Sequence, residues 1–218
     1  MIPHVHQALA QVRELQARFL EKQYFKGYSG RARALSGTIA LVAAIGMSHE
    51  MFPKTTGAHV VGWGVVFAIG LVLNYGALVY WFLYESGDHP DFRRIKPAFD
   101  VMPALFVGGV LTYALIRTGQ YAWLPGVWMA QFGVAHLASQ RVLPKLIGTV
   151  GWYYIACGTL HLAMGGLDFT NPWPMGLVFF CGEWAGGFVL HFDRRTNTSI
   201  VELLAEFVFD LRAGREEV

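Results

Sequence analysis

The middle of this chain carries six apolar segments, each near the length that crosses a lipid bilayer. They lie at residues 37–53, 59–84, 98–117, 121–139, 145–166 and 173–192. A helix needs about 20 apolar residues to span the hydrocarbon core. The sequence therefore predicts an all-α polytopic membrane protein, built as a bundle of six transmembrane helices. Its expected partner is the lipid bilayer in which it is embedded.

The charge content agrees with this class of protein. Charged residues make up 15% of the 218 residues, against about 25% in a typical soluble domain. The net charge of +2 is small, and no basic patch is interleaved with aromatic residues as in nucleic-acid-binding proteins. We therefore expect no nucleic-acid partner.

The basic residues indicate an orientation. They gather in the N-terminal arm, which includes Arg31 and Arg33, in the loops at 85–97 and 140–145, and after residue 192. The alternate loops hold only Lys54 and Arg117 among Lys and Arg. Because cytoplasmic loops carry the excess of Lys and Arg, six spans place both termini in the cytoplasm.

Three parts follow from this topology. Residues 1–36 hold an N-terminal amphipathic helix and a juxtamembrane loop, 37–192 form the transmembrane domain, and 193–218 hold a C-terminal amphipathic helix. The polar face of the Ser199–Arg212 segment is acidic, which is a poor match for anionic lipid. We expect this helix to dock on a protein partner or on a second copy; a loosely ordered tail is the alternative.

A Gly-x-x-His pattern occurs three times, at Gly46–His49, Gly133–His136 and Gly158–His161. A glycine three residues before a histidine shares its helix face, so it leaves room for a haem or a quinone ring. It equally allows close helix packing. The seven-residue spacing of Gly151, Gly158 and Gly165 favours packing, and Tyr154 borders that seam.

Depth decides which histidines can act together. His49 and His161 are expected about one turn below the outer surface, so they are the candidate ligands for a haem or a metal ion and the candidate partners for a quinone. His136 is expected on the opposite side, because the fourth and fifth spans run antiparallel. His136 and Tyr154 are further candidate cofactor-binding residues.

Two carboxylates are the candidate catalytic residues for proton handling, Glu50 and Glu183. Together with the histidines they give a mixed nitrogen and oxygen ligand set, which suits a transition metal or a proton relay. Glu183 falls near the middle of the last span, where a carboxylate needs a partner or water. Its neighbours Gly182, Gly186 and Gly187 indicate close helix contacts or a cavity.

These features favour a redox subunit with an intramembrane His/Glu site for haem or quinone near the outer leaflet. A small transporter or channel is an alternative, with Glu183, Asn74 and Gln131 as its polar path. A structural or assembly subunit without chemistry is a third reading, and the sequence leaves open whether the chain is an enzyme.

Overall fold

The computed structural model describes residues 28–85, 96–140, 143–144, 146–165 and 168–192. The amphipathic helices expected near the two termini fall within 1–27 and 193–218, so they lie outside the described residues. Their docking on a partner or a second copy stays a prediction.

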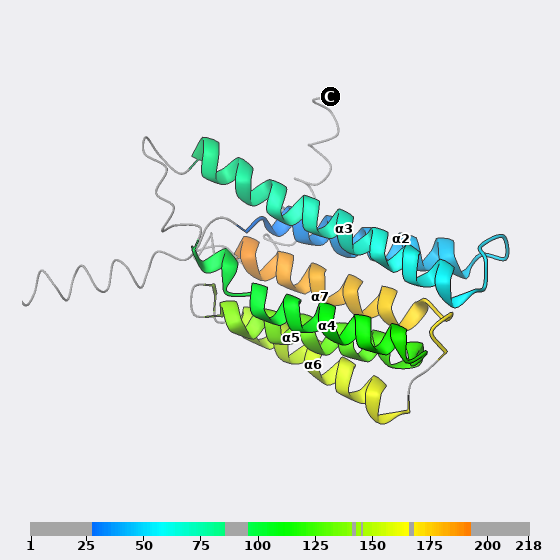
Figure 1. Ribbon diagram of the computed structural model, residues 1–218. Helices are drawn as coiled ribbons and strands as arrows, with labels where there is room; N and C mark the ends of the chain where they lie inside the picture. The colour runs from blue at the N-terminus through cyan, green and yellow to red at the C-terminus, as the bar shows by residue number, and fades with distance from the viewer. Residues whose placement is uncertain (1–27, 86–95, 141–142, 145, 166–167, 193–218) are drawn as a thin grey trace, which may run out of the picture.

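The described part of the chain holds six long α-helices and no strand, which confirms the all-α class. The helices are α2 (Gly30–Ser48), α3 (Thr56–Tyr80), α4 (Met102–Arg117), α5 (Leu124–Ser139), α6 (Ile147–Ala163) and α7 (Trp173–Phe192). Short turns of other helix types lie at Trp81–Glu85, Lys96–Phe99 and Tyr121–Trp123. The long helices lie side by side with their axes roughly aligned (Figure 1).

Two of these helices are long and apolar enough to cross a membrane. They are the 29-residue stretch Thr56–Tyr84 and the 19-residue stretch Trp173–His191. The six-span bundle is therefore not confirmed. At 16 to 17 residues, α4, α5 and α6 are short, about 24–26 Å at 1.5 Å per residue against a core of about 30 Å.

The first helix begins earlier than expected, at Gly30 rather than at residue 37. The Ser29 side chain accepts a hydrogen bond from the backbone N–H of Ala32 at 3.3 Å, which is the usual N-cap geometry. Arg31 and Arg33 therefore lie in the first turn of α2 rather than in a loop. Of the two, Arg33 is buried.

Glycine brings the helices together in two tight pairs, α2 with α7 and α5 with α6. A Cβ added to Gly30 would lie 2.5 Å from the carbonyl oxygen of Gly187, and one added to Gly158 would lie 2.6 Å from the backbone nitrogen of Ala130. Such distances leave no space for a side chain. The expected α6 seam is thus a helix contact at Gly158 and at Gly151, which faces Gly133.

Gly165 departs from that expected seam. The helix ends at Ala163, and Gly165 has a φ of 82° with open space around its Cβ position. A left-handed glycine just past the last turn is a common way to end a helix. Its role is helix termination, not packing.

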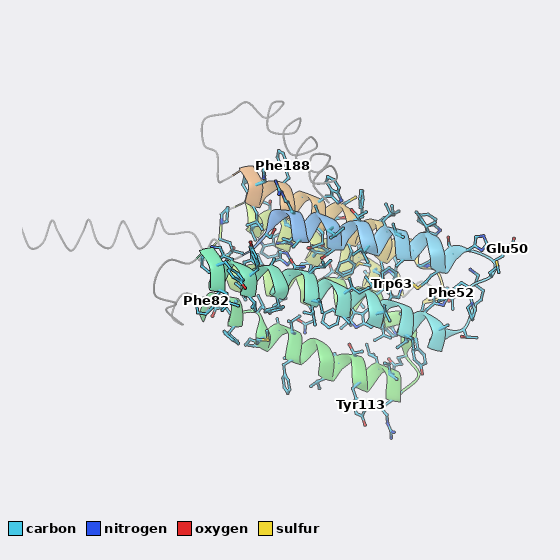
Figure 2. The ribbon with its side chains drawn as sticks, turned by 90° about the horizontal axis from the view of Figure 1, so that it is seen from above. Glu50, Phe52, Trp63, Phe82, Tyr113 and Phe188 are labelled. Carbon is cyan, nitrogen blue, oxygen red and sulfur yellow. The ribbon has the colours of Figure 1, made fainter. Side chains whose placement is uncertain are left out.

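The two remaining helices are more loosely held. α3 packs mainly against α2, and α4 packs mainly against α5. Figure 2 shows α4 along one edge of the bundle beside α3, with Tyr113 pointing away from it. Large apolar side chains are exposed on both helices: Val61, Val65, Phe67, Val72, Phe106, Val107, Val110, Leu111 and Tyr113.

Candidate functional site

A cluster of four buried polar side chains joins the two tight pairs. Arg33 comes from α2, Glu183 from α7, His136 from α5 and Tyr154 from α6. The guanidinium of Arg33 donates from Nε to Glu183 Oε2 at 3.1 Å and from Nη2 to Oε1 at 2.7 Å. The Tyr154 hydroxyl donates to the same Oε1 at 3.1 Å. The carboxylate therefore receives three hydrogen bonds and a bidentate counter-charge.

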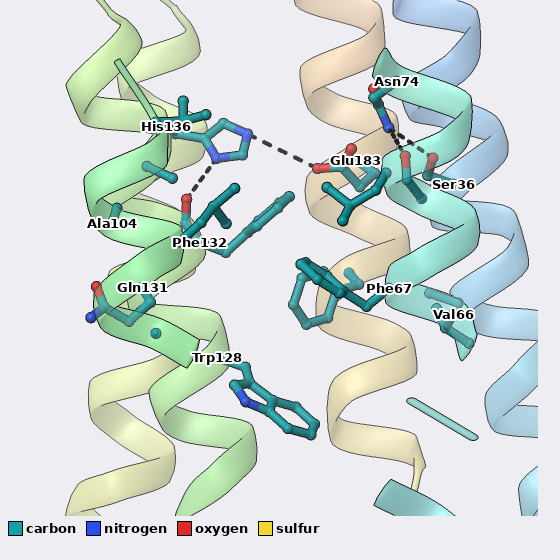
Figure 3. Close-up of a pocket in the computed structure, with 18 of the residues that line it drawn as sticks. Ser36, Val66, Phe67, Asn74, Ala104, Trp128, Gln131, Phe132, His136 and Glu183 are labelled. Carbon is teal, nitrogen blue, oxygen red and sulfur yellow. Dashed lines mark hydrogen bonds and ion pairs between the residues drawn. The ribbon is translucent and has the colours of Figure 1, made fainter. Parts of the chain in front are cut away.

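His136 completes the cluster in one tautomer. Its Nδ1 lies 2.8 Å from the carbonyl oxygen of Phe132, which can only accept, so Nδ1 carries the hydrogen. Its Nε2 is hydrogen-bonded to Arg33 Nη2, which can only donate. The imidazole is therefore neutral, and because Arg33 and Glu183 cancel, the whole cluster is electrically neutral. Figure 3 shows His136 facing Glu183 across the site.

Glycines give this cluster its space. A Cβ on Gly182 would overlap the Tyr154 hydroxyl, and one on Gly186 would lie 2.8 Å from the guanidinium of Arg33. The adjacent Gly187 instead meets the backbone of α2. Of the two expectations for these glycines, close helix contact holds at Gly187, whereas Gly182 and Gly186 face side chains of the cluster and none of the three lines the cavity.

A cavity of about 480 Å³ extends from the cluster. Residues of α2, α3, α4, α5 and α7 line it. Its walls are largely aromatic and apolar, with lining side chains that include Trp63, Phe67, Trp128, Phe132 and Phe179. Figure 3 shows the arrangement, with Glu183 and His136 toward one end and Trp128 toward the other. A mostly apolar cavity of this size with a few polar groups is typical of small-molecule sites.

Four other polar side chains on the wall are joined in two hydrogen-bonded pairs. Asn74 Nδ2 donates to Ser36 Oγ at 3.0 Å and to the Gly70 carbonyl oxygen at 2.9 Å. Trp128 Nε1 donates to Thr112 Oγ1 at 2.8 Å. Arg33 and Glu183 are the charged side chains among the lining residues, so the Arg33–Glu183–His136 end is the stronger candidate for recognition of a polar group.

The expected residues divide between the two ends of the bundle. Arg33 lies in the first turn of α2 and His136 in the last turn of α5, so the cluster lies toward that end. His49 and Glu50 follow the far end of α2 and are exposed. His49 is sixteen positions after Arg33, about 24 Å along a helix. Glu183 therefore meets His136 and Tyr154, not Glu50.

His161 is buried near the end of α6, and its Nε2 has no hydrogen-bond partner among the described residues. It does not line the cavity, whereas Asn74 and Gln131 do. In the parts of the chain described here, no three His, Cys, Asp or Glu side chains are grouped so as to hold a metal ion. The pairing of His49 with His161 as metal or haem ligands gains no support from their positions.

Arg33 is the residue that the sequence reasoning missed. Its signal is the stripe of small residues on α2, because Gly37, Ala40 and Ala44 are buried on the same face. Extending that stripe one turn toward the N-terminus reaches Arg33. A positive charge on a packing face needs a buried partner, and Glu183 is the candidate that the apolar segments offer.

Searches of protein-family models, curated proteins and solved structures found no match to this chain. The site is therefore interpreted from its own geometry.

Proposed function

We propose that this chain is a six-span membrane protein that binds a quinone-class molecule in its cavity, as a subunit in electron transfer. The observation that carries the proposal is a cavity of about 480 Å³ with aromatic walls and one polar end. In the proposed orientation α2 starts from the cytoplasm, so the site lies in the inner half of the bilayer rather than near the outer leaflet.

The chemistry of the polar end favours a neutral ring with carbonyl or hydroxyl groups. The hydrogen bonds within the cluster use Nε and Nη2 of Arg33, and a guanidinium has five N–H donors. A quinone oxygen accepts from such donors, and a quinol hydroxyl donates to a carboxylate. A charged ligand would unbalance the Arg33–Glu183 pair, which is costly in a buried site.

Quinone is favoured over haem by the positions of the histidines. His136 Nε2, the atom that would ligate iron, is engaged by Arg33. His49 Nδ1 accepts from the Met51 N–H at 3.3 Å, which in a neutral imidazole puts the proton on Nε2 and removes that lone pair. His136 and His49 therefore offer hydrogen bonds more readily than axial ligands. His59 and His161, whose Nε2 atoms have no hydrogen-bond partner among the described residues, do not line the cavity.

The test is binding of a tail-less benzoquinone analogue, followed by quenching of tryptophan fluorescence in the purified protein. Trp128 lines the cavity, whereas Trp152 on α6 is 63% exposed and does not. We expect saturable quenching of the tryptophan fluorescence. Trp128→Phe should reduce the fraction of the fluorescence that the ligand quenches. Trp152→Phe should lower the total fluorescence but should not reduce the ligand-dependent quenching. Absence of saturable quenching in the wild-type protein would sink the proposal.

A proton-coupled transporter is the second candidate, favoured by the position of the cluster between the two helix pairs. Arg33 and Glu183 belong to α2 and α7, and His136 and Tyr154 belong to α5 and α6. Protonation of Glu183 would weaken this junction. Reconstituted vesicles with a trapped pH dye test it: Glu183→Gln should abolish proton flux, and a wild-type protein without flux would contradict the transporter.

A further inference from the structure

The cavity reaches the surface at the middle of α3 and α4. Of its lining residues, those that are exposed are Gly64 and Phe67 on α3 and Gly109 on α4. The other lining residues, on α2, α5 and α7 among them, are buried or half-buried. Gly64 is eight residues into α3 and Gly109 is seven residues into α4, so the opening lies away from the helix ends.

The glycines at this opening face empty space. A Cβ added to Gly64 or to Gly109 would meet no atom within 4 Å. The next residue along the wall, Gly108, instead faces the Gln131 side chain at 3.6 Å. Gly64 and Gly109 therefore keep the passage between α3 and α4 wide without taking part in helix contacts.

The surroundings of the opening are apolar. Val65 on α3 and Phe106 and Val110 on α4 are exposed nearby, and the charged side chains that line the cavity, Arg33 and Glu183, are at its far end. In the proposed six-span topology this surface faces hydrocarbon. A molecule that enters through this opening therefore comes from the bilayer, and the part of it that lies in the opening is uncharged.

The length of the cavity leaves room for more than a ring. In Figure 3, Asn74 and Glu183 are both toward the same end of the pocket. Asn74 is ten positions after Gly64 on α3, a rise of about 15 Å. A quinone ring held at Arg33 and Glu183 would leave the stretch toward Gly64 unfilled.

We propose that the ligand is a lipid-dissolved isoprenoid quinone, whose tail leaves the cavity between α3 and α4 past Gly64 and Gly109. This inference rests on the proposed function, because it assigns the ring to the Arg33–Glu183 end. Its own content is the passage: the ligand enters sideways from the bilayer, and its tail stays in the opening while the ring is bound.

The test replaces the opening glycines by leucine. Gly64→Leu and Gly109→Leu put a bulky side chain into the passage without displacing a neighbour. Gly76→Leu is the matched control, because Gly76 on α3 also has open space but does not line the cavity. Binding of two probes is measured in nanodiscs by fluorescence quenching: the tail-less benzoquinone analogue and the same ring with an isoprenoid tail.

We expect the opening variants to weaken binding of the tailed quinone at least tenfold and to change binding of the tail-less analogue less than threefold. The control should bind both probes as the wild type does. If the wild type binds the tail-less analogue and the opening variants bind the tailed quinone normally, the passage is wrong and the proposed function stands.

Two other outcomes also decide the matter. A folded opening variant that loses both probes equally would place the ring at the glycines and overturn the tail path. A wild type that binds neither probe would overturn the proposed function, and the passage with it.

Discussion

Glycine has opposite roles in the two regions of this bundle. In the α2–α7 and α5–α6 pairs, a Cβ on Gly30, Gly133 or Gly158 would lie 2.5 to 2.6 Å from a neighbouring backbone atom. On α3 and α4, the Cβ positions of Gly64, Gly76 and Gly109 face open space. The same residue type thus closes one region and leaves the other open.

The tight region and the loose region have different roles: one holds the polar cluster in place, and the other bounds the opening of the cavity. The tight pairs hold Arg33, Glu183, His136 and Tyr154 where a buried ion pair can be fully hydrogen-bonded. The loose side bounds the cavity and carries its opening. The proposed quinone site requires both, since a buried charge pair needs rigid partners and a lipid ligand needs a way in.

The largest expected effect comes from breaking the ion pair between α2 and α7. Arg33→Met or Glu183→Met alone leaves an uncompensated buried charge, which typically costs about 3–5 kcal/mol. The double variant should be more stable than either single variant, because no charge remains unpaired. Unfolding of the purified proteins measures the three free energies, and additive losses would show that the pair is not buried as a unit.

The next largest effect tests the tight region against the loose one. Gly187→Leu would force the α2 backbone away, because its Cβ would lie 2.6 Å from the Gly30 carbonyl oxygen. Overpacking of this kind costs about 1–3 kcal/mol. Gly76→Leu is the control and should be neutral or slightly stabilising, because leucine is the better helix former. Equal melting temperatures for the two variants would contradict the difference in packing between the tight pairs and α3.

A smaller effect is expected from a single hydrogen bond at the junction of the pairs. Tyr154→Phe removes the donor at 3.1 Å from Glu183 Oε1 and keeps the ring. Loss of a hydrogen bond to a charged group costs about 1.5–3 kcal/mol, and we expect the lower end because Arg33 still holds the carboxylate. Tyr113→Phe serves as control, since Tyr113 is 66% exposed. An unchanged free energy of unfolding in Tyr154→Phe would contradict the claim that this hydrogen bond stabilises the contact between the two helix pairs.

The smallest effect lies in the loop before α7. Asp168 accepts from the Thr170 N–H at 2.9 Å and from its hydroxyl at 2.8 Å, and these hydrogen bonds, the backbone one first, lower the pKa of the carboxyl. The ionised Asp168 carboxylate therefore stabilises the folded protein at pH values above the unfolded pKa of about 3.9. This stabilisation is lost as the pH falls through the lower pKa of the folded state.

For this exposed group we expect Asp168→Asn to cost about 0.3 kcal/mol at pH 7, after allowance for solvent screening. The difference should shrink as the pH falls below about 3.9. Melting curves on both sides of this pH measure it, with Asn171→Ala as a control on the same loop for effects that do not depend on pH. A larger difference at low pH would reverse the assigned sign.

The helices were predictable because their apolar runs are long and charge-poor. The start of α2 was not, since Arg33 reads as the edge of a solvated arm until its partner is known. That partner, Glu183, lies 150 positions away in the chain, and no local pattern reports such a pairing. The sequence therefore indicates which polar residues are buried more readily than it indicates which of them contact one another.

The same limit applies to the candidate site. Glu183, His136 and Tyr154 stand out as polar groups in apolar helices, and the structure brings them together. His49 and Glu50, the expected partners of Glu183, are instead exposed beyond the far end of α2. The apolar runs placed Glu183 near mid-span and His136 at the inner side, but Arg33 bonds to both side chains through Nη2, and no local pattern in the sequence reports that shared partner.

A photoreactive quinone with an isoprenoid tail tests the central claim most directly. Irradiation of the membrane-embedded protein, followed by mapping of the labelled peptides, reports which helices surround the ligand. The account predicts labels on cavity residues of α3 and α5, such as Phe67 and Trp128, that excess unlabelled quinone suppresses. Labels confined to the exposed face of α6 around Trp152 and Leu160, or insensitive to competition, would contradict it.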